Sequence, residues 1–127
     1  MYPFIVYGTL RVGGSRARVW RAHATAERGT LAGFRLRDSG RRYPVVVPAT
    51  EGSVVVDVLT ATTVESYKVL LRRFDEIENV GGGLYVRTFE QALVGHESVE
   101  GWLYRPGPAL SNKIATMPVI ASGDWLG

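Results

Sequence analysis

Residues 62–87 read TTVESYKVLLRRFDEIENVGGGLYVR, and this stretch predicts one helix, a sharp turn and the start of a strand. Apolar side chains recur at helical spacing from Tyr67 to Ile77, so one stripe of the helix faces a core. Thr62 and Glu65 have the spacing of a capping box, which indicates where the helix begins. We expect the helix to run from about Val64 to Glu78.

Glu78 lies four residues after Phe74 and seven after Leu71. At about 100° per residue, this spacing places its carboxylate at the end of the apolar stripe. A carboxylate there must be paired, hydrogen-bonded or used for chemistry, because burying an unpaired charge is costly. The alternative is a carboxylate that reaches water where the helix ends. Asn79 and the glycines at 81–83 then stop the helix.

The composition fits a single globular domain over residues 1–127, with 46% hydrophobic and 21% charged residues. The absence of cysteine excludes a disulfide framework, a thiolate metal site and a cysteine nucleophile. Since the two histidines are far apart, we predict no metal and no cofactor. No apolar run approaches the roughly 20 residues of a membrane span, and the opening MYPFIVYGTL lacks the features of a signal peptide. We therefore expect no membrane partner and a cytoplasmic location.

The net charge of +3 is unevenly distributed, because the first 50 residues hold nine arginines against Glu27 and Asp38. Such a basic half could indicate nucleic acid binding. The arginines are scattered through strand-like and loop segments without interleaved aromatic residues, so we interpret them as solvated surface. We predict no nucleic-acid partner, and no binding to DNA at physiological salt.

Short apolar runs separated by turn residues predict about six or seven strands around the single long helix. Pro48 is expected to end one of these strands, and Glu51-Gly52 to form a turn before the valine-rich strand Ser53 to Thr60. Residues 16–22 are expected to form a short helix. The predicted strands are 3–7, 30–37, 45–47, 53–60, 85–93 and 98–104. Since no βαβ alternation or repeat is present, the pattern favours an α+β fold with a barrel-like sheet.

The first predicted strand leads into Gly8-Thr9-Leu10-Arg11, followed by Gly13-Gly14-Ser15. A strand that enters a glycine-bearing loop can direct backbone N–H groups at an anion or a developing oxyanion. The alternative is a plain turn. The loop lacks the GxxxxGK[ST] pattern of a P-loop.

Several blocks of sequence resemble one known family in their order along the chain. They are Val6-Tyr7-Gly8-Thr9-Leu10-Arg11-x-Gly13, Gly33-Phe34-x-Leu36 followed by Tyr43-Pro44, Phe74-Asp75-x-x-Glu78 followed by Tyr85-x-Arg87, Gly101-Trp102-x-Tyr104, and Ser122-Gly123-Asp124-Trp125. Together they resemble the gamma-glutamylcyclotransferase-like family, in its small bacterial form. The resemblance covers nearly the whole chain.

This resemblance implies a single-domain mixed β-barrel with one main packed helix. It also implies a cavity in which Glu78 is the general base. The residues that would hold the substrate are Tyr7, Gly8, Thr9, Leu10, Tyr85 and Tyr104. The chain differs from many members at Arg16, where they carry asparagine, and at Asn79, where they carry glycine.

Other polar residues in these blocks have structural interpretations. We predict that Asp75 is structural and that Arg87 pairs with Asp75 or Glu78 rather than with a substrate carboxylate. Ser122 has no histidine partner in the sequence that would form a hydrolase triad.

Two functions remain open from the sequence. The first is an intramolecular cyclotransferase that acts on a gamma-glutamyl amine and releases 5-oxoproline and the free amine. The second is a non-catalytic module that binds a small anionic or amino-acid-like ligand in the same cavity. In either case the partner is a small molecule, and the protein is expected to be a monomer or a homodimer.

Overall fold

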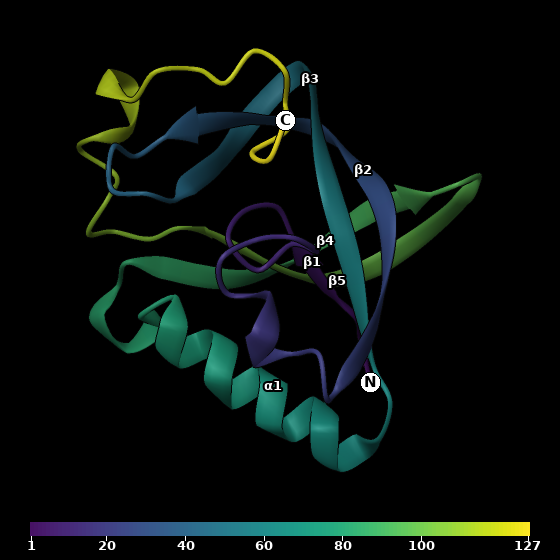
Figure 1. The fold of residues 1–127 in the computed structure, drawn as a ribbon. Helices are drawn as coiled ribbons and strands as arrows, with labels where there is room; N and C mark the ends of the chain where they lie inside the picture. The colour runs from purple at the N-terminus through teal and green to yellow at the C-terminus, as the bar shows by residue number, and fades with distance from the viewer.

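Two long strands, β2 (Ala24–Asp38) and β3 (Pro44–Ala61), form much of a closed barrel in the computed structural model, which describes residues 1–127 (Figure 1). The barrel is completed by β1 (Phe4–Val6), β4 (Tyr85–Val94) and β5 (Glu97–Pro106), in the order β1-β3-β2-β4-β5. β1 pairs antiparallel with β3 and parallel with β5, so the barrel is mixed. The predicted α+β fold, a single-domain mixed β-barrel with one main helix, is confirmed.

The prediction of six or seven short strands is wrong, because two of the predicted strands belong to β3. Pro48 does not end the strand, since it pairs with Phe34 of β2. The register then shifts to a pair between Ser53 and Ala32, so residues 49–52 form a bulge opposite Gly33. Glu51-Gly52 therefore lies within this bulge and does not reverse the chain. Tertiary pairing with β2 overrides the local preference of proline and glycine for strand ends.

The long helix α1 (Val64–Ile77) lies along one side of the barrel, opposite the yellow C-terminal segment in Figure 1. Its N-cap is Thr63, whose hydroxyl accepts a hydrogen bond from the Ser66 amide at 3.0 Å. The predicted capping box of Thr62 and Glu65 is therefore wrong, because the N-cap lies one residue later and a serine occupies the third helical position. Leu70 and Phe74 are fully buried, as the apolar stripe predicted.

The segment predicted as a short helix at residues 16–22 is a single 3-10 turn, η1 (Ala17–Val19). Two further 3-10 turns, η2 (Val80–Gly82) and η3 (Ile114–Thr116), follow α1 and β5. None of the helices has the length and apolar character needed to span a membrane.

β1 connects two hydrophobic clusters, because alternate side chains of a strand point to opposite faces. Phe4 and Val6 belong to the cluster that includes α1, and the Phe4 ring packs edge-on against Phe74 with centroids 5.0 Å apart. Ile5 and Tyr7 belong to the second cluster, which contains apolar side chains of β2, β3 and β5. Burial on both faces explains why β1 is a continuous apolar run. It also fixes the point at which the chain leaves the strand and enters the Gly8 loop.

Candidate active site

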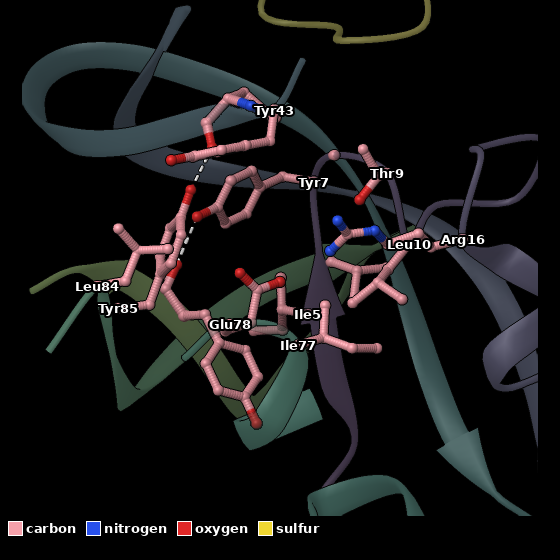
Figure 2. Close-up of a pocket in the computed structure, with 14 residues that line it drawn as sticks. Ile5, Tyr7, Thr9, Leu10, Arg16, Tyr43, Ile77, Glu78, Leu84 and Tyr85 are labelled. Atoms are coloured by element: carbon pink, nitrogen blue, oxygen red, sulfur yellow. Dashed lines mark hydrogen bonds between the residues drawn. The ribbon is translucent and has the colours of Figure 1, made fainter. Parts of the chain in front are cut away.

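A cavity of about 130 Å³ opens where the loop after β1 meets the end of α1 (Figure 2). All seven residues predicted for the site line it. The lining residues are Ile5, Val6, Tyr7, Gly8, Thr9, Leu10, Arg16, Tyr43, Pro44, Ile77, Glu78, Leu84, Tyr85 and Tyr104. The volume suits an amino-acid-sized group, since pockets for drug-sized ligands measure about 300–1,000 Å³.

Glu78 caps the C-terminal end of α1, where its amide donates to the Phe74 carbonyl at 2.9 Å. Figure 2 shows its carboxylate directed from the helix end into the space between Tyr7 and Arg16. The carboxylate has no ion pair and accepts no hydrogen bond within the protein. Burial raises the pKa of Glu78 from its ordinary value of 4.5 to about 7, and the Arg16 guanidinium opposes that rise. The carboxyl group can therefore gain or lose a proton near neutral pH.

The loop that faces Glu78 has its carbonyl groups occupied and its N–H groups free. The carbonyls of Gly8, Thr9 and Leu10 accept hydrogen bonds at 3.0, 2.8 and 2.6 Å. Their donors are the Arg11 amide, the Arg16 amide and the Trp20 indole, respectively. The amides of the same three loop residues donate to no acceptor in the protein. Since these three residues line the cavity, their unpaired amides are available to a ligand that accepts hydrogen bonds.

Two glycines, Gly8 and Gly14, allow close packing of the loop backbone against its neighbours. A Cβ atom at Gly8 would lie 2.8 Å from Cδ of Pro44, and one at Gly14 would lie 2.3 Å from the Thr9 carbonyl oxygen. A side chain at Gly8 would displace Pro44 or the loop, and one at Gly14 would displace the loop backbone. These glycines therefore maintain the backbone path on which the free amides depend.

Three tyrosines form the opposite wall of the cavity. The Tyr7 hydroxyl donates to the Tyr104 carbonyl at 2.5 Å, and the Tyr85 hydroxyl donates to the Pro44 carbonyl at 2.8 Å. Burial is the largest cause that raises the pKa of Tyr7, Tyr85 and Tyr104 well above the ordinary value, so all three hydroxyls stay protonated. The Tyr7 and Tyr85 hydroxyls already donate to the protein and can only accept a further hydrogen bond from a ligand.

The Tyr104 hydroxyl donates to Asp75, at 2.5 Å from Oδ1. Arg87 binds the same carboxylate in bidentate fashion, with Nε–Oδ1 at 3.0 Å and Nη2–Oδ2 at 3.3 Å. The predicted pairing of Arg87 with Asp75 is confirmed. The guanidinium also lies 4.7 Å from the ring centroid of Trp102. This cluster ties α1 to β4 and β5, and it leaves Arg87 unavailable to a substrate.

A buried ionic cluster that we did not predict holds the end of the Gly8–Leu10 loop. Arg11 is 1% exposed, and its Nε lies 3.2 Å from Oδ2 of Asp57 in β3. Its Nη1 contacts Oδ1 of Asp124 at 2.5 Å. The Val12 amide also donates to Asp57, at 2.8 Å. The sequence signal was Asp57 itself, a charge inside the apolar run VVVDVL that requires a buried counter-charge.

Arg16 is the only cation among the residues that line the cavity. Its amide binds the Thr9 carbonyl, and Figure 2 shows its guanidinium beside Thr9, facing the cavity. The side chain is exposed and has no ion pair. No group of three or more His, Cys, Asp or Glu side chains is arranged to hold a metal ion.

The sequence and the fold were compared with those of known proteins. The family model described as "Gamma-glutamyl cyclotransferase, AIG2-like" matches residues 4–127. A search of curated protein sequences finds no significant match.

Among solved structures, the chain is similar to an aig2-like protein from Mus musculus, with a TM-score of 0.71 and 22% identity over 94% of this chain and 86% of that one. It is similar to an uncharacterized protein from Pyrococcus horikoshii, with a TM-score of 0.68 and 23% identity over 98% and 90%. It is also similar to a gamma-glutamyl cyclotransferase, with a TM-score of 0.65 and 14% identity over 83% and 66%. At these identities the likeness shows a shared fold.

Proposed function

This chain belongs to the gamma-glutamyl cyclotransferase, AIG2-like family, and we propose that it converts a gamma-glutamyl amine to 5-oxoproline and the free amine. Family and fold point to gamma-glutamyl cyclotransferase-like activity. We infer the identities of the substrate, the product and the general base from the cavity.

In the proposed reaction the α-nitrogen of the glutamyl group attacks the γ-carbonyl carbon of the same molecule. A C–N bond forms to close the five-membered lactam, and the bond from that carbon to the leaving amine breaks. The α-ammonium nitrogen loses two protons as it becomes the lactam nitrogen, and the leaving nitrogen gains two, so the amine departs as an ammonium ion. Because both reacting groups belong to one molecule, the protein contributes mainly by folding the substrate into a reactive shape.

Glu78 supports this proposal more than any other observation. Its carboxylate is directed into the cavity, lacks a protein partner and has a pKa raised to about 7. A general base works best when its pKa lies near the working pH. Glu78 would take a proton from the α-ammonium group and pass one to the leaving amine.

The free amides of Gly8, Thr9 and Leu10 have a matching role. As the lactam closes, negative charge develops on the γ-carbonyl oxygen. Preorganised N–H groups stabilise such an oxyanion without needing to reorient during the reaction. The loop is held in place by the buried Arg11 cluster, which keeps these donors fixed.

The second candidate function is a binding module without catalysis. The unpaired Arg16 favours it, because a free cation in the cavity can hold an anionic ligand without any chemistry. The fold alone does not distinguish the two functions.

The test is Glu78→Gln assayed on a panel of gamma-glutamyl amines, with 5-oxoproline release as the readout. Glutamine keeps the size of the side chain but cannot take the proton, so kcat should fall by roughly 10²–10⁴ while substrate still binds. Glu76→Gln is the matched control, since Glu76 is exposed on the same helix and does not line the cavity. Full activity in Glu78→Gln would rule out Glu78 as the base. A parent protein that binds gamma-glutamyl amines in a Glu78-dependent way without turnover would support the binding module.

A further inference from the structure

Arg16 is a charged group that the proposed reaction does not use. It stands just before η1, in the loop that also carries the free amides. Its backbone is fixed, because its amide donates to the Thr9 carbonyl at 2.8 Å. Its side chain is exposed, yet it lines the cavity and forms no ion pair or hydrogen bond. The guanidinium therefore stands at the mouth of the cavity with all its donors free.

The other charged donors near the site are already occupied. Arg87 binds Asp75 through two hydrogen bonds, and Arg11 is buried between two aspartates. The tyrosine hydroxyls of the wall donate to protein oxygens. An anionic group that arrives at this cavity from solvent thus meets one free cation, Arg16.

The size of the cavity indicates which part of the substrate reaches Arg16. About 130 Å³ accommodates an amino-acid-sized group, which is the glutamyl half. In the proposed reaction its α-nitrogen must contact Glu78 and its γ-carbonyl must contact the loop amides. The glutamyl half is then inside, and the amine half must extend through the mouth, where Arg16 is exposed.

We propose that Arg16 selects gamma-glutamyl amines whose amine half carries a carboxylate, as an amino acid or a peptide does, by binding that carboxylate at the cavity mouth. This inference rests on the proposed function. An arginine fork matches a carboxylate in geometry and charge, so the pair forms two parallel hydrogen bonds. A neutral alkylamine in the same position would leave the guanidinium without a partner.

The test uses two compounds that differ only in this carboxylate, gamma-glutamyl-alanine and gamma-glutamyl-ethylamide. The parent protein should prefer gamma-glutamyl-alanine by about tenfold in kcat/KM, which is the lower end for hydrogen bonds to charged groups because Arg16 is open to solvent. Arg16→Gln should reduce the ratio to about one, and Arg16→Lys should keep part of it. Arg18→Gln is the matched control, since Arg18 is exposed on η1 but does not line the cavity, and it should leave the ratio unchanged.

The ratio separates this role from the effect of Arg16 on Glu78. Arg16 lowers the pKa of Glu78, so Arg16→Gln alters proton transfer for both compounds alike, and that change cancels in the ratio. The proposal is overturned if the parent has equal kcat/KM for the two compounds, or if Arg16→Gln lowers kcat/KM by the same factor for both. Arg16→Gln could instead lower kcat/KM equally for both compounds, and have no such effect on compounds whose glutamyl α-carboxylate is replaced by a carboxamide. That result would assign Arg16 to the α-carboxylate of the glutamyl half.

Binding measured by calorimetry separates this proposal from the proposed function. If neither compound yields 5-oxoproline, but the parent binds gamma-glutamyl-alanine about tenfold more tightly and Arg16→Gln does not, then Arg16 has the role we assign and the cyclotransferase activity is refuted. Turnover of both compounds with equal kcat/KM would support the activity and refute the role of Arg16. A parent that binds neither compound would refute both.

Discussion

Replacing Glu78 with glutamine should make the protein more stable above neutral pH, although most substitutions destabilise. In the folded state burial raises the pKa of Glu78 from its ordinary value of 4.5 to about 7. A carboxyl group with a raised pKa binds its proton more tightly in the folded state. Its contribution to stability is therefore fully present below pH 4.5, and it is lost as the pH rises toward 7.

The size of this effect follows from the two pKa values. A shift from 4.5 to about 7 corresponds to about 3 kcal/mol at pH 8, about 2 kcal/mol at pH 6 and less than about 0.5 kcal/mol at pH 4.5. Glutamine has no charge to desolvate, so Glu78→Gln removes this cost. The free energy of unfolding of the variant should exceed that of the parent by these amounts.

Urea denaturation of both proteins at pH 4.5, 6 and 8 measures the difference directly. Glu76→Gln serves as the control, because Glu76 is exposed and should show no comparable dependence on pH. A Glu78→Gln variant less stable than the parent at pH 8, or a difference that is the same at all three pH values, would show that the Glu78 charge carries no such cost.

The value of kcat/KM for 5-oxoproline release should fall about tenfold per pH unit below pH 7, because only the deprotonated Glu78 accepts a proton. A pH–rate profile with its inflection near 4.5 would contradict this expectation. Asp75→Asn should lower the free energy of unfolding by about 1–3 kcal/mol, as measured by thermal melts, because it weakens the bidentate bond to Arg87. Loss of kcat without loss of stability would contradict a structural role for Asp75. Arg11→Met should lower the free energy of unfolding by about 3–5 kcal/mol in urea titrations, because it leaves Asp57 buried without its cation, whereas parent-like stability would show that the cluster contributes nothing.

The parts of the site that depend on local geometry could be predicted from the sequence. The position of Glu78 at the cavity follows from helical periodicity, which is a property of one short segment. The pair between Asp75 and Arg87 spans only the turn after α1, so the order of elements brings the two side chains together. Even the strand β1 was recognisable, because burial on both faces produces a continuous apolar run.

The features that the sequence did not predict arise from distant pairing. The continuity of β3 through Pro48 depends on its register with β2, which no local propensity contains. Arg11 finds Asp57 and Asp124 at separations of 46 and 113 residues. The acceptors of the Tyr7 and Tyr85 hydroxyls are backbone carbonyls, whose positions depend on the finished barrel.

The contact between Arg11 and Asp124 also sets an order for events on the ribosome. Synthesis proceeds at about 5–20 residues per second, so Arg11 exists for roughly 6–23 seconds before the aspartate 113 residues later is made. The parallel partner of β1 is made almost as late, since Phe4 pairs with Trp102 of β5. Throughout this interval an arginine without its full set of partners is more stable in water than in a core. A nascent chain that has not yet reached Asp124 therefore lacks one of the two carboxylates that hold the cavity loop in the finished protein.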